Sequence, residues 1–335
     1  MALLWMDGFE GLGTTGTVQG IAYRYPGAST SNLNVGPGRL TGYGLDAVST
    51  NPTGYTPALT QDPTLIVGCA FLSKNTTDYS QLMLYDNATS GINITITASV
   101  PSTIITKRGS TVLDTTTLAT TLMTYTWYYF ELKVFCHNTS GTVEVRIDGE
   151  TVVSLIGIDT RSGVDDFYNR VRWVLQNGYM DDYYICDGTG DTFNDFVGTC
   201  KILAVFPNAD TATEEWTPST AGTHYIRIDE NPPSTTDYVG TATQNAIDLY
   251  SYPSLIGNST ILAIQVTTLV SCISGMTILF EAPVVSNGVT ELGPDFQLTS
   301  ATYQEVSHIS TTDPNTGEPW IIAGLTAAQI GMRAM

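Results

Sequence analysis

The sequence has little charge, and positive charge is especially scarce. Only 13% of its 335 residues are charged, and 13 Lys and Arg stand against 32 Asp and Glu, which gives a formal net charge of −19. A protein that binds nucleic-acid phosphates needs clustered Lys and Arg, and an anionic membrane surface repels an acidic chain. We therefore expect neither nucleic acid nor a membrane among its partners.

Long apolar runs are also missing. No run approaches the roughly 20 residues that a membrane-spanning helix requires. The first residues, MALLWMDGFEG, contain no basic segment and reach Asp7 almost at once, so no signal peptide is expected. The sequence thus predicts a protein that is made in a cytoplasm and does not insert into a membrane.

The short motifs of common enzyme classes are absent. There is no GxSxG, P-loop or GxGxxG, and the three histidines, His137, His224 and His308, are expected to be structural. Glu144 and Asp148 share a strand face, but at ~3.3 Å per residue they lie about 13 Å apart, beyond the carboxylate spacing of glycosidases. We therefore expect a protein that is not an enzyme.

Cysteine pairs with a metal-binding or redox spacing are missing as well. No two cysteines form CxxC, and the shortest gap, from Cys186 to Cys200, fits no zinc-finger pattern. Most of the cysteines lie in apolar runs, which predicts small buried thiols. The odd count leaves a thiol for an intermolecular bridge as an open alternative. The five are Cys69, Cys136, Cys186, Cys200 and Cys272.

The residues that are abundant favour β-structure. Thr, Ser, Asn and Tyr are frequent, and 31 Gly and 15 Pro provide turns. In GTVEVRIDGETVVSL the apolar residues alternate with polar ones, and Asp148-Gly149 predicts a two-residue hairpin turn. Further strands are expected at Thr64–Leu72, Gln81–Tyr85, Ile92–Ala98, Trp127–Cys136, Thr142–Ile147, Thr151–Leu155, Arg170–Leu175, Tyr179–Cys186, Lys201–Pro207, Ile261–Leu269, Met276–Ala282 and Thr302–His308.

A polar stretch, NADTATEEWTPSTAG, separates two parts of the chain. Its Pro, Gly and charged residues predict a boundary, with one β-sandwich at residues 1–212 and a smaller β-sandwich at residues 213–335. Only Gly240–Tyr250 and Thr326–Ile330 have short patterns compatible with a helix. The fold class is therefore all-β.

The one concentration of acidic residues lies in MDDYYICDGTGDTFND. Asp187, Asp191 and Asp195 are candidate ligands of a calcium ion, since Ca²⁺ takes several oxygen ligands from a flexible loop. The spacing is not that of an EF-hand, and Asx turns without a metal are the alternative. No other cofactor is expected.

Tyrosine side chains are the other candidates for a binding site. Tyr23, Tyr25, Tyr43 and Tyr55 lie in an early Gly- and Pro-rich region, and Tyr128-Tyr129 and Tyr183-Tyr184 form doublets. Such rings either stack on sugars or belong to protein contacts and the core. The sequence leaves these readings open.

Several phrases together resemble structural proteins of tailed bacteriophages. The opening ALLWMDGFEGLGT is similar to the start of a widespread type of virion protein, and DPNTGEPWIIAGLTAAQIGMRAM is similar to its C-terminal phrase. Between them, WYYFELKVFCHNTSGTVEVRIDGETVVSL resembles paired strands of concanavalin-A-like (laminin-G-like) sandwiches, and MDDYYICDGTGDTFNDFVGTCKILAVFPNAD resembles the segment that closes that sandwich in such phage proteins.

The resemblance implies a concanavalin-A-like jelly-roll at residues 1–212 and a non-enzymatic virion component exposed on the particle as a tail, collar, fibre-associated or capsid-decoration protein. Its implied partners are other virion proteins and further copies of itself. The alternative is a carbohydrate-binding module of the virion, with a host surface glycan as partner. An acidic surface suits the outside of a particle, whereas a surface lining DNA is expected to be basic.

Overall fold

The structure is a computed structural model that describes residues 2–335 except 19, 29–31, 49–51, 78, 256, 258, 259 and 274. The chain divides into two compact units, Met1–Ala204 and Val205–Met335, called unit 1 and unit 2 below. The boundary expected at residue 212 lies within strand β16 (Ala209–Glu214) of unit 2. No helix in the described part of the chain is long and apolar enough to cross a membrane.

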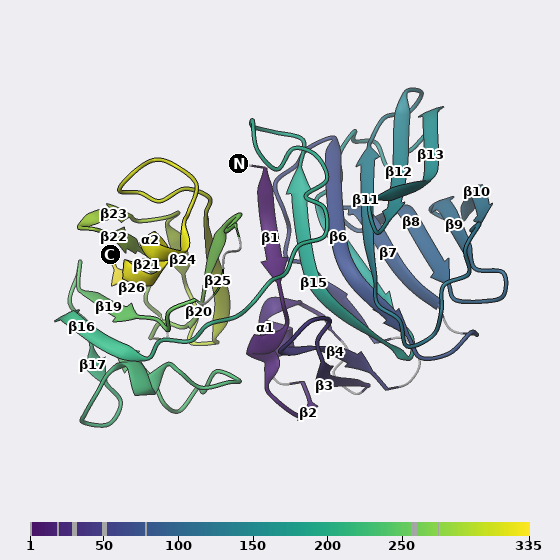
Figure 1. Cartoon of the computed structure of the whole chain (residues 1–335). Helices are drawn as coiled ribbons and strands as arrows, with labels where there is room; N and C mark the ends of the chain where they lie inside the picture. The colour runs from purple at the N-terminus through teal and green to yellow at the C-terminus, as the bar shows by residue number, and fades with distance from the viewer. Residues whose placement is uncertain are drawn as a thin grey trace. The chain divides into compact units, whose positions relative to one another are not determined.

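Unit 1 is a sandwich of a nine-stranded sheet, sheet A, and a six-stranded sheet, sheet B (Figure 1). All strand pairs in both sheets are antiparallel among the residues described. In spatial order, sheet A contains β13 (Glu150–Ile158), β12 (Gly141–Ile147), β11 (Tyr128–Phe135), β6 (Thr64–Ser73), β15 (Gly178–Asp187), β4 (Tyr43–Ala47), β3 (Leu33–Pro37) and β2 (Gly16–Thr17), with β1 (Leu3–Asp7) also paired to β15. Sheet B contains β10 (Thr111–Thr117), β9 (Thr103–Arg108), β8 (Thr89–Thr97), β7 (Tyr79–Asp86), β14 (Arg170–Leu175) and β5 (Thr53–Tyr55).

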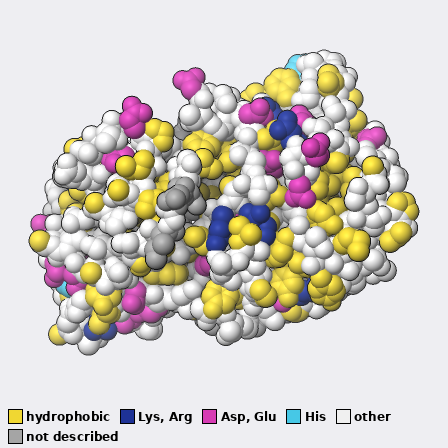
Figure 2. All heavy atoms as spheres, viewed as in Figure 1, with side chains coloured by type: hydrophobic (Ala, Val, Ile, Leu, Met, Phe, Trp, Pro, Cys, Tyr) yellow, Lys and Arg dark blue, Asp and Glu magenta, His cyan; other side chains and the backbone are white. Residues whose placement is uncertain are grey.

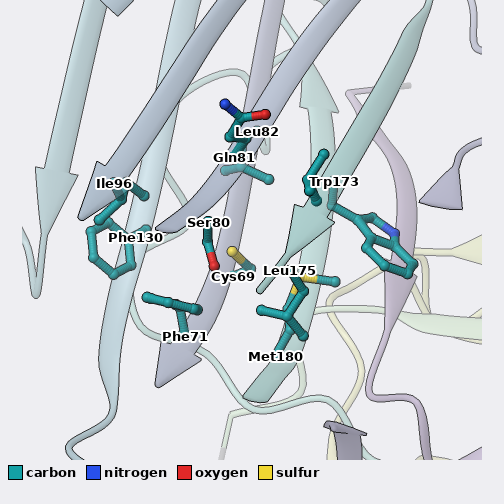
Figure 3. A pocket seen from close by; sticks show the side chains of 11 residues that line it. Cys69, Phe71, Ser80, Gln81, Leu82, Ile96, Phe130, Trp173, Leu175 and Met180 are labelled. Carbon is teal, nitrogen blue, oxygen red and sulfur yellow. The ribbon is translucent and has the colours of Figure 1, made fainter. Parts of the chain in front are cut away.

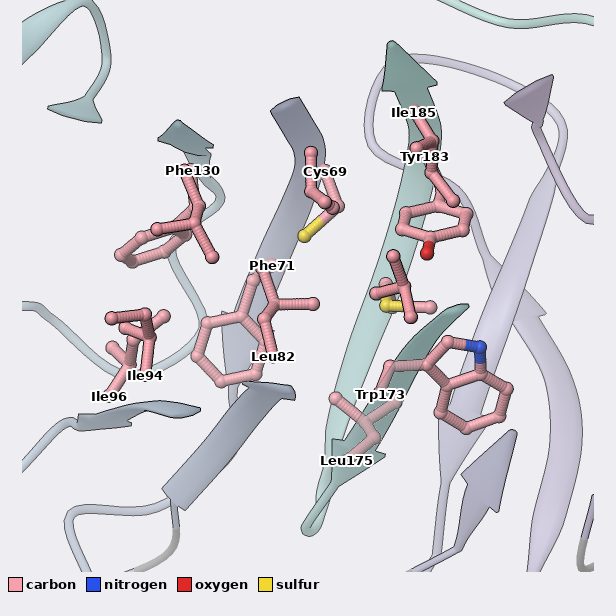
Figure 4. Close-up of a cluster of buried hydrophobic side chains, with 14 of the residues drawn as sticks. Cys69, Phe71, Leu82, Ile94, Ile96, Phe130, Trp173, Leu175, Tyr183 and Ile185 are labelled. Carbon is pink, nitrogen blue, oxygen red and sulfur yellow. The ribbon is translucent and has the colours of Figure 1, made fainter. Parts of the chain in front are cut away.

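The two sheets enclose one hydrophobic core, because alternate residues of each strand point inward. Phe130 of β11, Trp173 of β14 and Tyr183 of β15 are each at most 1% exposed. Figure 4 shows these side chains facing one another from the two sheets, together with apolar residues of β6, β7 and β8. Two short helices, η1 (Glu10–Leu12) and α1 (Ile21–Arg24), follow β1 along the chain.

The hairpin expected from the sequence is confirmed. Val143, Val145 and Ile147 of β12 are buried, and Glu144 and Arg146 lie on the opposite face, where they form an ion pair. Asp148 and Gly149 have φ values of 50° and 85°, as a tight hairpin turn requires.

Unit 2 is smaller and is also built from antiparallel strands. A seven-stranded sheet and two two-stranded sheets surround a separate core that contains Tyr250, Phe280 and Trp320. The strands are β16, β19 (Ile247–Ser251), β26 (Gln329–Ala334), β21 (Ile278–Glu281), β24 (Phe296–Leu298), β22 (Val284–Ser286) and β23 (Val289–Glu291) in the large sheet, β17 (Thr217–Pro218) with β18 (Val239–Gly240), and β20 (Ile264–Val270) with β25 (Gln304–Ser310). The helices are η2 (Tyr225–Arg227) and α2 (Ile322–Ala327).

The all-β fold class is confirmed, since unit 1 is a sandwich of two antiparallel sheets and the smaller unit 2 is also built from antiparallel strands. The strand expected at Lys201–Pro207 is wrong, because this segment makes no ladder and its Ile202 N–H bonds instead to the Asp182 carboxylate. No helix forms at Gly240–Tyr250, which ends in β19. The expected helical turn at Thr326–Ile330 is only partly right, since α2 ends at Ala327 and β26 begins two residues later.

The interior of unit 1 contains a cavity of about 20 Å³ between the sheets (Figure 3). Its walls are apolar apart from Ser80 and Gln81 and include Cys69, Phe71 and Trp173. A space of this size admits at most a water molecule.

Trp173 is expected to be among the most important core residues of unit 1. Its ring is 1% exposed and packs edge-to-face on Tyr25, with 5.7 Å between the ring centroids. Trp173→Ala should lower the free energy of unfolding of unit 1 by roughly 3–5 kcal/mol, because it leaves a large cavity. Urea unfolding followed by circular dichroism measures this change. Val112→Ala, at a side chain that is 55% exposed, should change it by no more than about 0.5 kcal/mol.

Candidate functional site

Connections that are far apart in the sequence meet where β6 ends and β15 begins. The N–H of Lys74, just after β6, donates to the carbonyl of Asn177 in the β14–β15 turn at 3.0 Å. The N–H of Tyr125, in the β10–β11 loop, donates to the carbonyl of Ser73 at 2.8 Å. Lys74 Nζ also forms an ion pair with Asp46 of β4. Three connections of unit 1, β6–β7, β10–β11 and β14–β15, therefore meet at this end of sheet A, beside Asp46 of β4.

The β10–β11 loop, residues 118–127, is tied down at its start. Leu118 and Leu122 are buried, and both of their N–H groups donate to Ser102, one to its carbonyl and one to its hydroxyl, each at 2.9 Å. The Met123 N–H donates to the hydroxyl of Tyr128 at 2.8 Å. The loop thus has anchored apolar residues at its base, although it contains no regular secondary structure.

The part of this loop that faces solvent carries aromatic side chains. Tyr125 is 70% exposed and Met123 is 63% exposed. Trp127 is half-buried and lies against Tyr179 of β15, with 6.1 Å between the ring centroids. We call Met123, Tyr125, Trp127 and Tyr179 the aromatic loop cluster.

Tyr179 packs closely against β3 on the outer face of sheet A. A Cβ atom added to Gly36 of β3 would lie 2.6 Å from the Tyr179 ring, so only glycine allows this close approach. Lys74 Nζ lies over the same ring, 4.3 Å from its centre. The ring therefore contacts both a strand backbone and an ammonium group.

Much of the remaining outer face of sheet A is covered by residues 195–204, which we call the strap. Tyr129, Glu131 and Lys133 alternate with core residues of β11 and so point to this outer face. Lys133 pairs with Asp195, Glu131 accepts a hydrogen bond from the Gly198 N–H at 2.8 Å, and the Tyr184 hydroxyl accepts one from the Val197 N–H. The strap therefore satisfies polar side chains of the sheet with its own backbone.

A network of two carboxylates and Arg39 fixes the end of the strap. Asp182 Oδ2 accepts a hydrogen bond from Arg39 Nε at 2.7 Å, and Asp182 Oδ1 accepts one from the Ile202 N–H at 2.8 Å. Arg39 also donates its backbone N–H to Asp181 and its guanidinium to the carbonyl of Cys200. The guanidinium lies 5.1 Å from the ring centre of Tyr129.

Two carboxyl groups of this region have strongly raised pKa values. Burial raises the pKa of Glu10 to about 9, and the negative charges of Asp181 and Asp7 add to the effect. Burial also raises the pKa of Asp181 to about 7, with the adjacent Asp182 charge as the next cause. Such shifts also occur in structural networks. Because these groups are buried beside the strap, we assign them a structural role.

The three aspartates expected to bind calcium have different partners. Asp187, at the end of β15, is buried and accepts hydrogen bonds from the N–H and hydroxyl of Thr189, as in an Asx turn. Asp191 is exposed, and Asp195 pairs with Lys133. Within the part of the chain that the structure describes, no three His, Cys, Asp or Glu side chains gather as metal ligands. The structure therefore does not bring Asp187, Asp191 and Asp195 together around one ion.

The histidines make hydrogen bonds within their own units. His137 Nδ1 accepts from the Thr139 and Ser140 N–H groups. His224 Nδ1 lies 2.7 Å from Asp248, which is fully buried. His308 lies between the carbonyl of Ala282 and Glu291, and although burial opposes its charge, these two hydrogen bonds raise the pKa of His308.

The cysteines are free thiols, and all except Cys200 are buried. Burial raises the pKa of Cys69 to about 12 and of Cys136 to about 11, so these thiols are not reactive nucleophiles. Cys200 lies on the strap, where its sulfur is 3.0 Å from the Tyr129 hydroxyl.

The aromatic doublets singled out in the sequence are mostly internal. Tyr129, Tyr183 and Tyr184 are buried, as is Tyr25, whose hydroxyl donates to Asp7. The rings at the surface are instead those of Tyr125, which is exposed, and of Trp127 and Tyr179, which are half-buried, and the sequence did not single them out as binding residues. The signal for two of them was the uncharged run TTLMTYTWYY between two strands.

No protein-family model and no curated protein sequence matches the chain. Solved structures with a similar fold include an alginate lyase (9% identity, TM-score 0.41, 54% of this chain and 96% of that one). They also include the carbohydrate-binding module CBM66 from Bacillus subtilis (11%, 0.34, 49% and 97%). A third is an endo-β-1,4-glucuronan lyase from Trichoderma reesei (14%, 0.33, 52% and 93%). The likeness is one of fold.

These comparisons contradict the expectation that the chain is not an enzyme, because lyases are among the proteins with such a sandwich. The expectation rested on missing sequence motifs. Catalytic groups on a sandwich are brought together by tertiary structure, and a fold hosts several functions. The absence of a short motif therefore excludes no activity.

The raised carboxyl pKa values predict how stability depends on pH. A carboxyl group whose pKa is raised by folding binds its proton more tightly in the folded state. Its contribution to stability is therefore complete below the unfolded pKa and is lost as the pH rises through about 7 for Asp181 and about 9 for Glu10. Urea unfolding should show a lower free energy of unfolding at pH 9 than at pH 5. Glu10→Gln should reduce this difference, whereas Glu150→Gln in the exposed hairpin turn should not; equal pH dependence of wild type and Glu10→Gln would contradict the assignment.

Arg39 is expected to keep the strap on the sheet. Arg39→Met removes the guanidinium that Asp182 and the Cys200 carbonyl share, and leaves a buried carboxylate without its cation. Trypsin cleavage after Lys201, within the strap, should become roughly tenfold faster or more, because the strap opens more often. Mass spectrometry of timed digests measures it. Arg172→Met, at a guanidinium stacked on Tyr55, is the control and should leave the rate unchanged.

Proposed function

We propose that this chain is a structural component of a tailed-bacteriophage virion. It is exposed on the outside of the particle, as a tail, collar, fibre-associated or capsid-decoration protein. Its partners are other virion proteins and further copies of itself. The support is the resemblance of its terminal and central phrases to such proteins, together with the roles that those phrases have in the fold.

The opening phrase, WMDGFEG, makes a set of hydrogen bonds at the boundary of the core of unit 1. Asp7 accepts hydrogen bonds from the Phe9 N–H at 2.7 Å, from Arg24 Nη1 at 2.8 Å and from the Tyr25 hydroxyl at 2.9 Å. Trp5 Nε1 donates to the same tyrosine oxygen at 3.3 Å. Residues that resemble the virion proteins therefore make hydrogen bonds within the core of unit 1.

The C-terminal phrase, DPNTGEPW, has a comparable role in unit 2. Asp313 closes a turn by accepting a hydrogen bond from the Asn315 N–H at its carboxylate and one from the Gly317 N–H at its carbonyl. Trp320 is 1% exposed, and its Nε1 donates to Ser310 Oγ. This is the observation that carries the proposal, because both phrases that resemble virion proteins make buried contacts in the units that contain them.

The surface charge is consistent with exposure on a particle. The formal net charge is −19, and Figure 2 shows a face on which charged side chains are few among hydrophobic and uncharged polar ones. A net charge of one sign keeps a protein soluble and opposes binding to DNA. The acidic surface therefore favours an external position over one that lines the packaged genome.

The second candidate function is a carbohydrate-binding module of the virion that aids adsorption to the host. The aromatic loop cluster favours it, because ligand sites combine aromatic side chains with a few polar groups. The two functions are compatible, since a virion protein on the outside of the particle meets the host surface first.

Mass spectrometry of purified particles tests the virion function. Particles made from the genome that encodes this chain should contain it in many copies after density-gradient purification and high-salt washing. Antibody labelling seen by electron microscopy then distinguishes tail, collar, fibre and capsid. If the chain is present in the lysate but absent from washed particles, the proposal fails. A non-virion phage enzyme followed through the same purification is the control for carry-over.

A further inference from the structure

Tyr125 is exposed at a position where the backbone is strained. Its φ is 57°, in the left-handed region that a bulky side chain rarely adopts. The side chain is 70% exposed, so it adds little to the core in return. Strained residues are retained mainly where function requires their position. This observation points to a contact made by the Tyr125 ring.

The surface around Tyr125 is already formed. The loop is anchored through Leu118 and Leu122, and the Tyr125 N–H is bonded to the carbonyl of Ser73. Trp127 is supported by Tyr179, which itself packs closely against Gly36. Binding of a ligand to these rings therefore costs little conformational entropy, because the site is already ordered.

The charges of the site are already paired. Lys74 is the only Lys or Arg in the described residues of the three connections, 74–77, 118–127 and 176–177. Its ammonium group is held by Asp46, by the carbonyl of Ala47 and by the Tyr179 ring. An anionic ligand would find no unpaired cation there, and the net charge of −19 would repel it. The electrostatics favour an uncharged ligand.

The turns next to the β10–β11 loop contain two amide side chains. Asn75 and Asn177 lie in the two turns joined by the Lys74 N–H, and Asn75 Oδ1 accepts hydrogen bonds from the N–H and hydroxyl of Thr77. Amides offer both donors and acceptors to hydroxyl groups, and a sugar ring has an apolar face edged by hydroxyls. Aromatic faces with neighbouring amides thus match an uncharged sugar better than a wholly apolar peptide segment.

We propose that the aromatic loop cluster binds an uncharged polysaccharide, with Tyr125 and Trp127 as the stacking rings. This inference rests on the second candidate function and adds the site and the charge class of the ligand. It separates the chain from proteins that act on alginate or glucuronan, whose substrates are anionic. The Lys74–Asp46 pair is the feature that determines this preference.

Affinity electrophoresis of the full chain in gels containing soluble glucan, galactan or mannan tests the site, with alginate and polyglucuronate as anionic probes. At least one neutral polysaccharide should retard the wild type, and neither anionic one should do so. Tyr125→Ala and Trp127→Ala should each weaken binding about tenfold or more, as for central aromatic contacts in other interfaces. Tyr125→Phe, which keeps the ring, should bind within about threefold of the wild type.

Tyr238→Ala is the matched control, because it removes an exposed tyrosine of unit 2 and should leave binding unchanged. Circular dichroism and the melting temperature show that each variant is folded. No retardation by any neutral polysaccharide, stronger retardation by an anionic one, or unchanged binding of Tyr125→Ala and Trp127→Ala would overturn the inference.

Asp46→Asn tests the charge argument separately. It leaves Lys74 without its carboxylate partner, so alginate or polyglucuronate should begin to retard this variant at low salt and stop doing so at high salt. If neither anionic polysaccharide retards this variant, the ion pair does not set the charge preference.

The outcomes also separate the two proposals. Glycan binding by a chain that is absent from particles rejects the virion function alone. A virion protein that binds no glycan rejects only this site.

Discussion

The bulge in β15 at Asp181 and Asp182 is the constraint on which most of unit 1 depends. The pairing of β15 with β6 shifts register between Asp181 and Tyr184, and Asp182 adopts a φ of 51°. A β-bulge reorients side chains without ending the strand. Here it lets two adjacent carboxylates bind Arg39 and the strap while Met180 and Tyr183 remain in the core. A regular strand would place one of the two carboxylates in the core.

This arrangement determines which surfaces of unit 1 are available to partners. The strap covers Glu131 and Tyr184, which are each 2% exposed although they lie on the outer side of the sheet. The middle of that face is thus used for internal contacts. At the end of the same sheet, past Tyr179, the connecting loops lie beyond the strap contacts and carry exposed rings. In many proteins a rigid sandwich provides the stability, and the loops that it positions make the contacts with ligands.

The sequence predicted the regular parts of the fold well and the site poorly. The alternation in GTVEVRIDGE specifies a hairpin because period-two burial and an Asp-Gly turn are local properties. Lys201–Pro207 has equally apolar residues, but its hydrogen bonds go to side chains of distant strands, and no local pattern reveals that. Asp187 and Asp195 are close in sequence, yet Asp187 accepts a hydrogen bond from the Thr189 N–H, whereas Asp195 forms an ion pair with Lys133. Trp127 and Tyr179 are far apart in sequence, and only the packing of the β10–β11 loop against β15 makes their rings neighbours.

The sequence by itself determined the all-β class, the hairpin, the acidic surface and the positions of most strands. These depend on composition, period and turn residues, which act over a few neighbouring positions. Tertiary structure decided which tyrosines are buried, where the strap lies and which loops form a common surface. Those outcomes depend on strand register and on the bulge at Asp182, because a shift of one residue moves a side chain to the other face of the sheet.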